Sequence, residues 1–311
     1  RSYVKFNGVA QTQAKIGLTN LKYGWFDAVD VPSPLNKIEV YTAGSSDFFS
    51  LFAVEVDGKI LVNNNITPPE LPSIPATGAS VGTEQGFSIV TYTGTGSAGT
   101  IPHGLSQNPE FIIFKQRNNE DDWRVWHKSI DDDEPQDYYL MLQSQNPRSS
   151  DQNQSFMNRV PPTGPVIHLG TDSAINGSST TMVAYCWHSV PGFSKFGKYI
   201  ANNDADGPYI DLGFKPAVVI VKDSSGGTFS WQIFDTKRDP HNLCHHTIRA
   251  DYGLVEITAE PTNASIDMLS NGFKVRAGSS SQANNSTDTY VYMAWAEAPS
   301  IDLYGGGANA R

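Results

Sequence analysis

The sequence predicts an all-β protein, and three observations support this fold class. Charged residues make up only 17% of the chain, while 27 Gly and 19 Pro are present, a composition typical of turn-rich β proteins. Short apolar runs are separated by clusters of Gly, Asn, Asp and Ser, and no stretch shows a capped amphipathic helical pattern. The third observation is an internal repeat. We therefore expect tandem antiparallel β-sandwich domains of a jelly-roll-like kind.

The repeat consists of two segments of about 108 residues that carry the same motifs in the same order. Pro109–Lys115 matches Pro216–Lys222 at an offset of 107 residues, and Val183–Trp187 matches Val291–Trp295 at an offset of 108. A Gly-Phe-Ser tripeptide that begins at Gly86 recurs at an offset of 106. Such nearly constant offsets indicate two diverged copies of one module.

The rest of the chain is organised around these copies. Residues 1–65 do not align with them, but Asp57-Gly58 between two apolar runs predicts a β-hairpin with a type I′ turn. Residues 66–85 are rich in Pro, Thr, Ser and Gly, which predicts a semi-rigid linker. The expected parts are a partial N-terminal β module at 1–65, the linker at 66–85, β-sandwich repeats at 86–191 and 192–303, and a Gly-rich tail at 304–311.

Charge and apolar pattern argue against two classes of partner. The net charge of -10 comes without the clustered Lys and Arg that neutralise phosphates, so no nucleic-acid binding is expected. No apolar run reaches the roughly 20 residues that a membrane helix needs, so no membrane insertion is expected. Two cysteines provide no disulfide framework, and Cys186 is expected to be a buried free thiol.

The aromatic residues divide into core and candidate binding positions. Trp126 lies on the alternate face of its strand and has Phe234 as its counterpart, so an outer sheet face or an inter-domain contact stays open for it. Tyr138 and Tyr139 are expected to be an exposed pair beside an acidic loop, where such rings can grip sugars or proteins. Four tryptophans at matched positions are expected in the sandwich cores, namely Trp123, Trp187, Trp231 and Trp295.

One segment resembles a calcium loop. Asn202, Asp204, Asp206 and Gly207 have the spacing of its first ligands and its glycine, but Gly213 stands where the final glutamate belongs. A solvated Asx turn is the alternative. No cofactor is expected, apart from the Ca²⁺ that this loop could hold.

A second segment gathers soft ligands, since His241, Cys244, His245 and His246 lie within six residues. His241 and His245 would share one face of a helix, but the surrounding pattern is that of strands, where adjacent histidines point to opposite sides. A polar loop and a metal site therefore both remain open.

The sequence supports catalytic residues even less than it supports a metal site. The run Asp131–Glu134 offers carboxylates of the kind that glycoside hydrolases use, but consecutive acids on a loop before Pro135 repel one another into solvent. The sequence contains no nucleophile elbow, zinc-protease, Walker or dinucleotide-binding motif. We expect a protein that is not an enzyme.

A set of motifs spread over nearly the whole chain is similar to a known family. They are His103–Leu105, Pro109–Ile113, Trp126–Lys128, Leu169–Asp172, Val183–Cys186, Gly192–Gly197, Phe234–Pro240, Leu269–Lys274 and Ala308–Arg311. Together they resemble a repeated domain of unknown function in tail proteins of marine tailed phages, especially cyanophages. Val54–Gly58 is similar to the closing strands of a domain that often precedes this repeat.

This resemblance implies a virion component, a tail fibre or receptor-binding appendage that attaches the particle to its host. It implies other virion proteins and a host-surface polysaccharide or protein as partners, with a homotrimer as the usual assembly. It carries over no catalytic or ligand residues. Loops at the sandwich ends are the expected binding elements. Two alternatives stay open, a purely architectural tail or capsid-decoration protein and a tailspike-type polysaccharide depolymerase.

Overall fold

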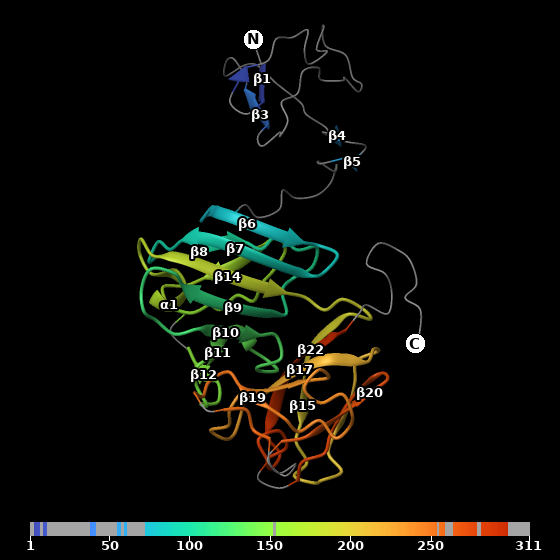
Figure 1. The fold of residues 1–311 in the computed structure, drawn as a ribbon. Helices are drawn as coiled ribbons and strands as arrows, with labels where there is room; N and C mark the ends of the chain where they lie inside the picture. The colour runs from blue at the N-terminus through green and yellow to red at the C-terminus, as the bar shows by residue number, and fades with distance from the viewer. Residues whose placement is uncertain are drawn as a thin grey trace. The chain divides into compact units, whose positions relative to one another are not determined.

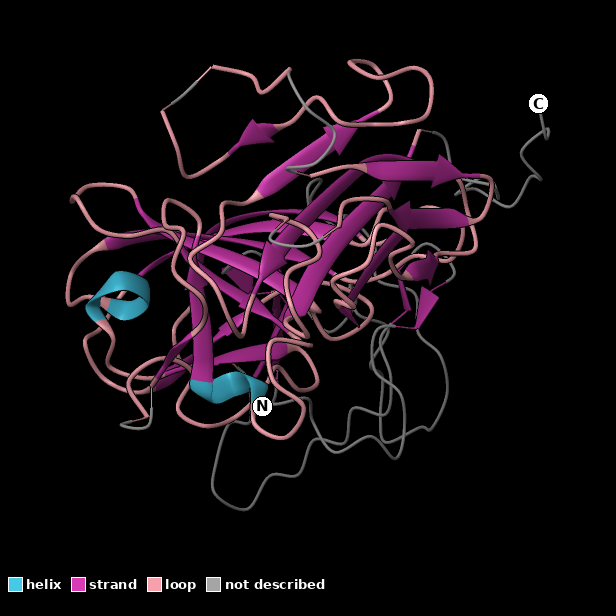
Figure 2. Cartoon of the chain, turned by 90° about the horizontal axis from the view of Figure 1, so that it is seen from below, coloured by secondary structure: helices cyan, strands magenta, loops and turns pink. Residues whose placement is uncertain are grey.

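The computed structural model describes residues 72–151, 154–253, 255–258, 264–278 and 281–297, and strand segments at 3–6, 9–10, 38–41, 55–56 and 59–60. The chain forms two compact units, Arg1–Thr67 and Pro68–Arg311. All strand pairs in the described residues are antiparallel, and helix is limited there to the turn η1 (Pro135–Asp137) and to α1 (Ser173–Asn176), the cyan ribbons of Figure 2. The predicted all-β fold is therefore confirmed. None of these described helices has the length and apolarity needed to cross a membrane.

The described strands of the first unit form two small sheets. One has the strand order β2 (Val9–Ala10), β1 (Tyr3–Phe6) and β3 (Ile38–Tyr41). The other pairs β4 (Glu55–Val56) with β5 (Lys59–Ile60), in the register that a two-residue hairpin requires. The two turn residues on which the expected type I′ geometry depends lie outside the described part of the chain.

The second unit begins with the first copy of the repeat, residues 72–191, which contains one large and one small sheet (Figure 1). The small sheet pairs β13 (Val166–Leu169) with β8 (Gly99–Pro102). The large sheet has the order β12 (Ser149–Ser150), β11 (Tyr138–Met141), β10 (Arg124–His127), β9 (Phe111–Gln116), β14 (Thr181–Trp187), β7 (Phe87–Thr93) and β6 (Ala76–Gly82).

The second copy, residues 192–297, repeats this arrangement. Its larger sheet has the order β15 (Ser194–Ile200), β22 (Thr289–Ala296), β17 (Pro216–Asp223), β18 (Gln232–Asp235) and β19 (Ile248–Arg249). Its smaller sheet has the order β16 (Tyr209–Asp211), β21 (Gly272–Val275) and β20 (Ile266–Leu269). The order β7-β14-β9-β10-β11 of the first copy is thus the order β15-β22-β17-β18-β19 of the second.

Each copy is a sandwich with its own core between its large and small sheets. In the first copy, Ile112 and Phe114 of β9 pack with Ile167 of β13, and all three are fully buried. In the second copy, Val219 of β17 packs with Phe273 of β21, and both are fully buried. Alternation of side chains along a strand leaves the other face of each large sheet to be covered by something else.

The two copies cover these remaining faces for each other through a third core, which we name the intercopy core. Its buried members are Phe111, Val125, Ile130 and Leu140 of the first copy and Phe196, Trp231, Val291 and Met293 of the second. Across it, the rings of Phe111 and Phe196 stack with centroids 5.8 Å apart. Strands that are apolar on both faces, as the sequence shows for β9 and β17, follow directly from this arrangement.

The intercopy core corrects the placement of the tryptophans. Trp231 is fully buried, but Trp187 and Trp295 are only half-buried against the intercopy core, and Trp123 is half-buried as well. Trp231, Trp187 and Trp295 therefore serve the contact between the copies and not the interior of one sandwich. A match between copies identified positions with a shared role, but it did not specify which face of the sheet they occupy.

The expected linker is also corrected by the structure. Residues 76–82 form β6, an edge strand that pairs with β7, and the side chain of Ile74 is buried in the first sandwich core. The strand was hidden because most of its side chains are exposed, so it lacks an alternating apolar pattern. Residues 66–71 of the expected linker lie outside the described part, as does the tail at 304–311.

Candidate functional site

A surface pocket of about 390 Å³ lies over Trp126 in the first copy. Trp126 is almost completely buried, and its ring nitrogen donates a hydrogen bond of 3.0 Å to the backbone oxygen of Pro135. The ring therefore belongs to the floor of the pocket and is fixed in place. Other lining residues are apolar prolines and polar side chains, namely Pro109, Pro135, Pro161, Pro162, Gln107, Asn108, Glu110 and Lys128.

Two oppositely charged side chains of the pocket are fixed by contacts to each other and to the chain. Lys128 Nζ lies 2.5 Å from Glu110 Oε1, and the other carboxylate oxygen of Glu110 accepts a hydrogen bond of 2.9 Å from the backbone amide of Ser189. The Ser189 hydroxyl donates to that same oxygen. Glu110 is thus oriented from two sides and presents a defined charge to the pocket.

The second copy keeps the scaffold of this pocket but not its side chains. The backbone amide of Lys128 donates to the carbonyl of Glu110 at 2.8 Å, and the amide of Thr236 donates to the carbonyl of Ala217 at 2.9 Å. These two bonds join matched positions on matched strands. Where the first copy has an ion pair, the second therefore has an alanine and a threonine, and Phe234 replaces Trp126.

A second pocket of about 440 Å³ adjoins the first, because Gln107 belongs to the lining of both. It is lined by residues of the turn after β6 and of the segment that joins the two copies, including Glu84, His188 and Pro191. His188 is buried, and its ring nitrogen Nδ1 is hydrogen-bonded to the carbonyl of Ser189 at 2.8 Å. The two pockets are therefore neighbours on the surface of the first copy.

The structure places the expected aromatic binding residues differently from the sequence analysis. Trp126 is a core residue that reaches the pocket only at its floor. Tyr138 and Tyr139 are half-buried and pack on opposite sides of the sheet, against the intercopy core and the first sandwich core respectively. An arginine covers each ring, with Arg148 and Arg124 both 4.4 Å from the ring centroids. They are therefore no exposed pair, since a strand points neighbouring side chains to opposite faces.

The segment that resembles a calcium loop forms linked Asx turns. Asn202 Oδ1 accepts the amide of Asp204 at 3.1 Å, and Asp204 Oδ1 accepts the amide of Asp206 at 2.8 Å. Asp206 is exposed and makes an ion pair of 3.0 Å with Lys274, whose ammonium lowers the pKa of that carboxyl below its usual value. The oxygens are already engaged by amides and a cation, so the geometry favours the Asx turn over a calcium site.

Carboxylates of the acidic run Asp131–Glu134 also make structural contacts. Asp131 Oδ1 accepts the backbone amides of Asp133 and Glu134, both at 3.0 Å, and its carboxylate pairs with Arg148 at 3.0 Å. Asp132 pairs with Lys198 of the second copy. The arrangement caps a turn and joins the two copies, and it does not oppose two carboxylates across a cleft.

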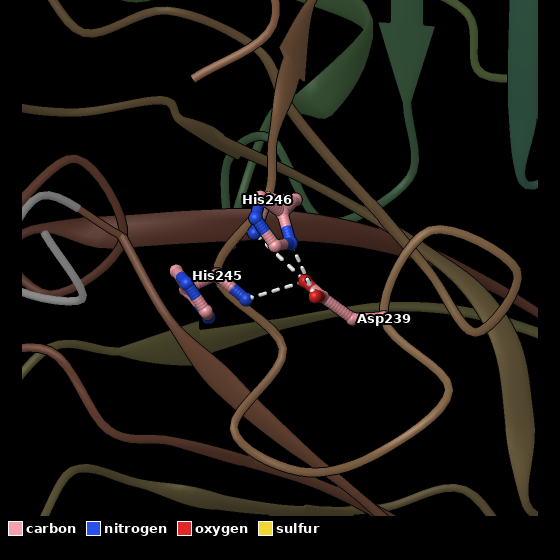
Figure 3. Close-up of side chains that lie close together, drawn as sticks. All are labelled: Asp239, His245 and His246. Atoms are coloured by element: carbon pink, nitrogen blue, oxygen red, sulfur yellow. Dashed lines mark hydrogen bonds and ion pairs between the residues drawn. The ribbon is translucent and has the colours of Figure 1, made fainter. Parts of the chain in front are cut away.

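The segment with soft ligands forms a compact cluster in the loop between β18 and β19, residues 236–247, which we name the histidine loop (Figure 3). One carboxylate oxygen of Asp239 accepts the backbone amides of His245 and His246, both at 2.7 Å. The other contacts Nδ1 of His246. One potential ligand atom each from Asp239, His245 and His246 lies within 4.8 Å of the other two.

The charge of Asp239 is favoured by these contacts. Its side chain is only 7% exposed, and this burial alone acts to raise the pKa of its carboxyl. The hydrogen bonds from the His246 ring and from the two amides outweigh burial, so that the pKa lies below its usual value. Asp239 is therefore an ionised carboxylate that organises the loop.

The remaining members of the expected cluster lie apart from these three residues. Cys244 is fully buried in the core of the second copy, where burial raises the pKa of its thiol to about 12. It remains a protonated thiol at neutral pH. His241 is exposed and is not part of the group. The sequence analysis missed Asp239, although a carboxylate six and seven residues before two histidines was a visible signal.

This fold places the chain in the all-β class, as two β-sandwiches packed against each other. The sequence from 72 to 299 matches a family described as a domain of unknown function, DUF7483. This match covers most of the chain and spans both copies, so the chain belongs to that family. No curated protein and no solved structure shows a significant match.

Proposed function

We propose that the chain is a virion protein of a tailed phage that attaches the particle to a host surface, and that the pocket over Trp126 takes the ligand. The main support for this proposal is the difference between the two copies at Glu110 and Lys128 and their matched positions. Both copies keep the backbone hydrogen bond at this position, but only the first places an ion pair there, beside a pocket. A preserved scaffold with changed side chains on one surface is typical of recognition, since the scaffold positions a site whose residues can vary.

The chemistry of the pocket suits a sugar unit. Prolines and the edge of Trp126 supply an apolar surface, while the amides of Gln107 and Asn108 and the charges of Glu110 and Lys128 supply hydrogen-bonding groups. A pyranose has an apolar C–H face and a rim of hydroxyls, so both kinds of surface find a partner. A volume of about 390 Å³ lies within the range of small-ligand sites.

The motifs shared with tail proteins of marine tailed phages support a host envelope as the source of that sugar. On this proposal the protein belongs to the tail or surface of the virion, contacts other virion proteins and binds a host polysaccharide without cleaving it. A homotrimer, the usual assembly of tail fibres, stays a prediction. The architectural and depolymerase alternatives become outcomes of the test.

A binding assay with a charge-neutral double variant tests the proposal. Glu110→Ala with Lys128→Thr installs the residues of the second copy, which its matched backbone already carries. Fluorescently labelled protein is incubated with a panel of marine cyanobacteria and with their purified surface polysaccharide. We expect wild-type binding to at least one strain and a loss of about tenfold or more in the variant, since removal of a charged pair from a site costs this much or more.

The matched control removes another ion pair of the same kind. Lys237 and Glu297 pair at 2.5 Å on the exposed surface of the second copy, with side chains 78% and 66% exposed. Lys237→Thr with Glu297→Ala is expected to bind as the wild type does. Equal losses in both double variants, or none in either, contradict the pocket assignment. Binding to no strain favours the architectural alternative, and release of new reducing ends from the polysaccharide favours the depolymerase.

A further inference from the structure

Both histidines of the cluster have one ring nitrogen fixed by an oxygen that can only accept. His246 Nδ1 contacts a carboxylate oxygen of Asp239, and His245 Nδ1 lies 3.0 Å from the carbonyl oxygen of Leu243. Each Nδ1 must therefore carry the proton of the neutral ring, and the lone pair remains on Nε2. Metal-binding histidines in proteins typically have this arrangement, with the second nitrogen donating to a carboxylate or a carbonyl.

We infer that His245 and His246 bind one divalent transition-metal ion of the Zn²⁺, Ni²⁺ or Cu²⁺ type through their Nε2 atoms, with Asp239 as the positioning carboxylate. The two rings belong to adjacent residues, with centroids 4.4 Å apart and planes inclined by 30°. Figure 3 shows them side by side on one arm of the histidine loop, with Asp239 reaching across from the other arm. Imidazole nitrogen selects these ions over Ca²⁺ and Mg²⁺, which prefer oxygen.

The loop that carries the pair is held in shape independently of any ion. Arg238 donates to the carbonyl of His246 at 3.1 Å and to the carbonyl of Ile233 at 2.7 Å. Its guanidinium also lies 2.6 Å from Asp235. Because these contacts and those of Asp239 fix the backbone, ordering of the ligands is not a large cost of binding.

Other histidines of the chain compete little with this pair. The described residues include all seven, and His103, His127 and His188 are buried. Cys244 is fully buried in the core of the second copy, and its thiol donates to the carbonyl of Asp235 at 3.7 Å. The two half-buried rings of His245 and His246 are thus the paired imidazoles that solvent ions can reach, and water completes the coordination.

Titration calorimetry on the full chain without a polyhistidine tag tests the inference, with ZnCl₂ as the probe and CaCl₂ as the oxygen-preferring comparison. We expect one Zn²⁺ per chain and no Ca²⁺ at the same concentration. His245→Asn and His246→Asn should each weaken Zn²⁺ binding at least about tenfold, because two ligands become one. His241→Asn removes an exposed histidine of the same loop and should leave the affinity unchanged.

Asp239→Asn tests the positioning role separately. An amide group facing His246 Nδ1 reverses the hydrogen bond and places the ring proton on Nε2, where the metal has to bind. We expect Zn²⁺ affinity to fall about 10- to 100-fold, with ¹⁵N NMR of the imidazole showing the Nε2–H tautomer in the metal-free variant. A ring that keeps the Nδ1–H tautomer contradicts the role of Asp239.

No saturable Zn²⁺ binding by the wild-type chain overturns the site, as does binding that survives His246→Asn unchanged. Melting curves without metal should be alike for the wild type, His245→Asn and His241→Asn, which separates loss of a ligand from loss of the fold.

Discussion

Asn176 and Asn284 lie at matched positions of the two copies and make the same three hydrogen bonds. Asn176 Oδ1 accepts the amide of Thr95 at 2.9 Å, and its Nδ2 donates to the carbonyls of Ser97 and Gly170, both at 2.7 Å. Both asparagines are fully buried. The bonds of Asn284 go to the equivalent atoms 107 residues further on, in Asn202, Asp204 and Ala277, at 2.9, 2.7 and 2.9 Å.

We expect Asn176→Ala and Asn284→Ala each to lower the free energy of unfolding by about 3 kcal/mol, because the bonded backbone groups lose their partners inside the protein. Chemical denaturation measures this loss. Asn119→Ala serves as the control, since Asn119 is exposed and its loss should change stability by less than about 0.5 kcal/mol. Similarly small losses of stability at all three positions would show that the side-chain amides of Asn176 and Asn284 do not stabilise the loops to which they are hydrogen-bonded.

The intercopy core predicts that the two copies unfold together. Trp231 is fully buried there, and its ring nitrogen donates to the carbonyl of Met141 in the first copy at 3.0 Å. Trp231→Ala should cost about 3 to 5 kcal/mol, whereas Trp123→Ala, at the matched half-buried position, should cost less. Calorimetry of the unit from Pro68 onwards should show one transition for both copies. Two separate transitions would contradict a shared core.

His127 makes stability depend on pH. It is fully buried, its Nε2 lies 3.3 Å from the carbonyl of Tyr292 in the second copy, and burial lowers its pKa from 6.5 to about 3. Above pH 6.5 the ring is neutral in both states and has no effect. As the pH falls from 6.5 towards 3, only the unfolded state takes up the proton, so stability is lost.

The loss should amount to about 1.4 kcal/mol per pH unit within this window. His127→Gln should reduce the slope of unfolding free energy against pH by about that amount relative to the wild type. Denaturant titrations at several pH values measure both slopes. An unchanged slope in His127→Gln would mean that the ring is protonated in the folded state.

The fold class and the duplication were accessible from the sequence because both rest on local patterns. Gly86 and Gly192 show why, since both adopt a positive φ, of 63° and 73°, just before matched strands. A β-carbon at Gly86 would lie 2.6 Å from a Val190 methyl group, so glycine is needed there. Backbone requirements of this kind remain visible after other residues diverge.

The contacts between the copies could not be predicted from local sequence patterns. Alternation assigns Trp126 and Val125 to opposite faces of one strand, but it does not say which face meets a small sheet and which meets the other copy. For that reason the half-buried tryptophans were expected inside the sandwiches. The sequence did not predict the edge strand β6, because its exposed Ser, Thr and Gly residues are also typical of linkers.

The two candidate sites differ in how far apart their residues lie in the sequence. Asp239, His245 and His246 are close in sequence, and what the sequence lacked was the turn that brings them together. The pocket over Trp126 gathers three separate segments, around residues 107–110, 126–135 and 161–162. No local pattern connects these segments, and their proximity follows only from the pairing of β9 with β10 and the return of the chain to the same end of the sandwich.

We propose that the first copy binds a host polysaccharide at the pocket over Trp126. Hydrogen exchange of the backbone amides, with and without saturating polysaccharide, tests it most directly because ligand contact slows exchange locally. We predict slower exchange in peptides that cover residues 107–110 and 126–135, and no change in the matched peptides 214–217 and 234–243 of the second copy. Protection confined to the second copy, or no protection in either while the polysaccharide is bound, would contradict the claim.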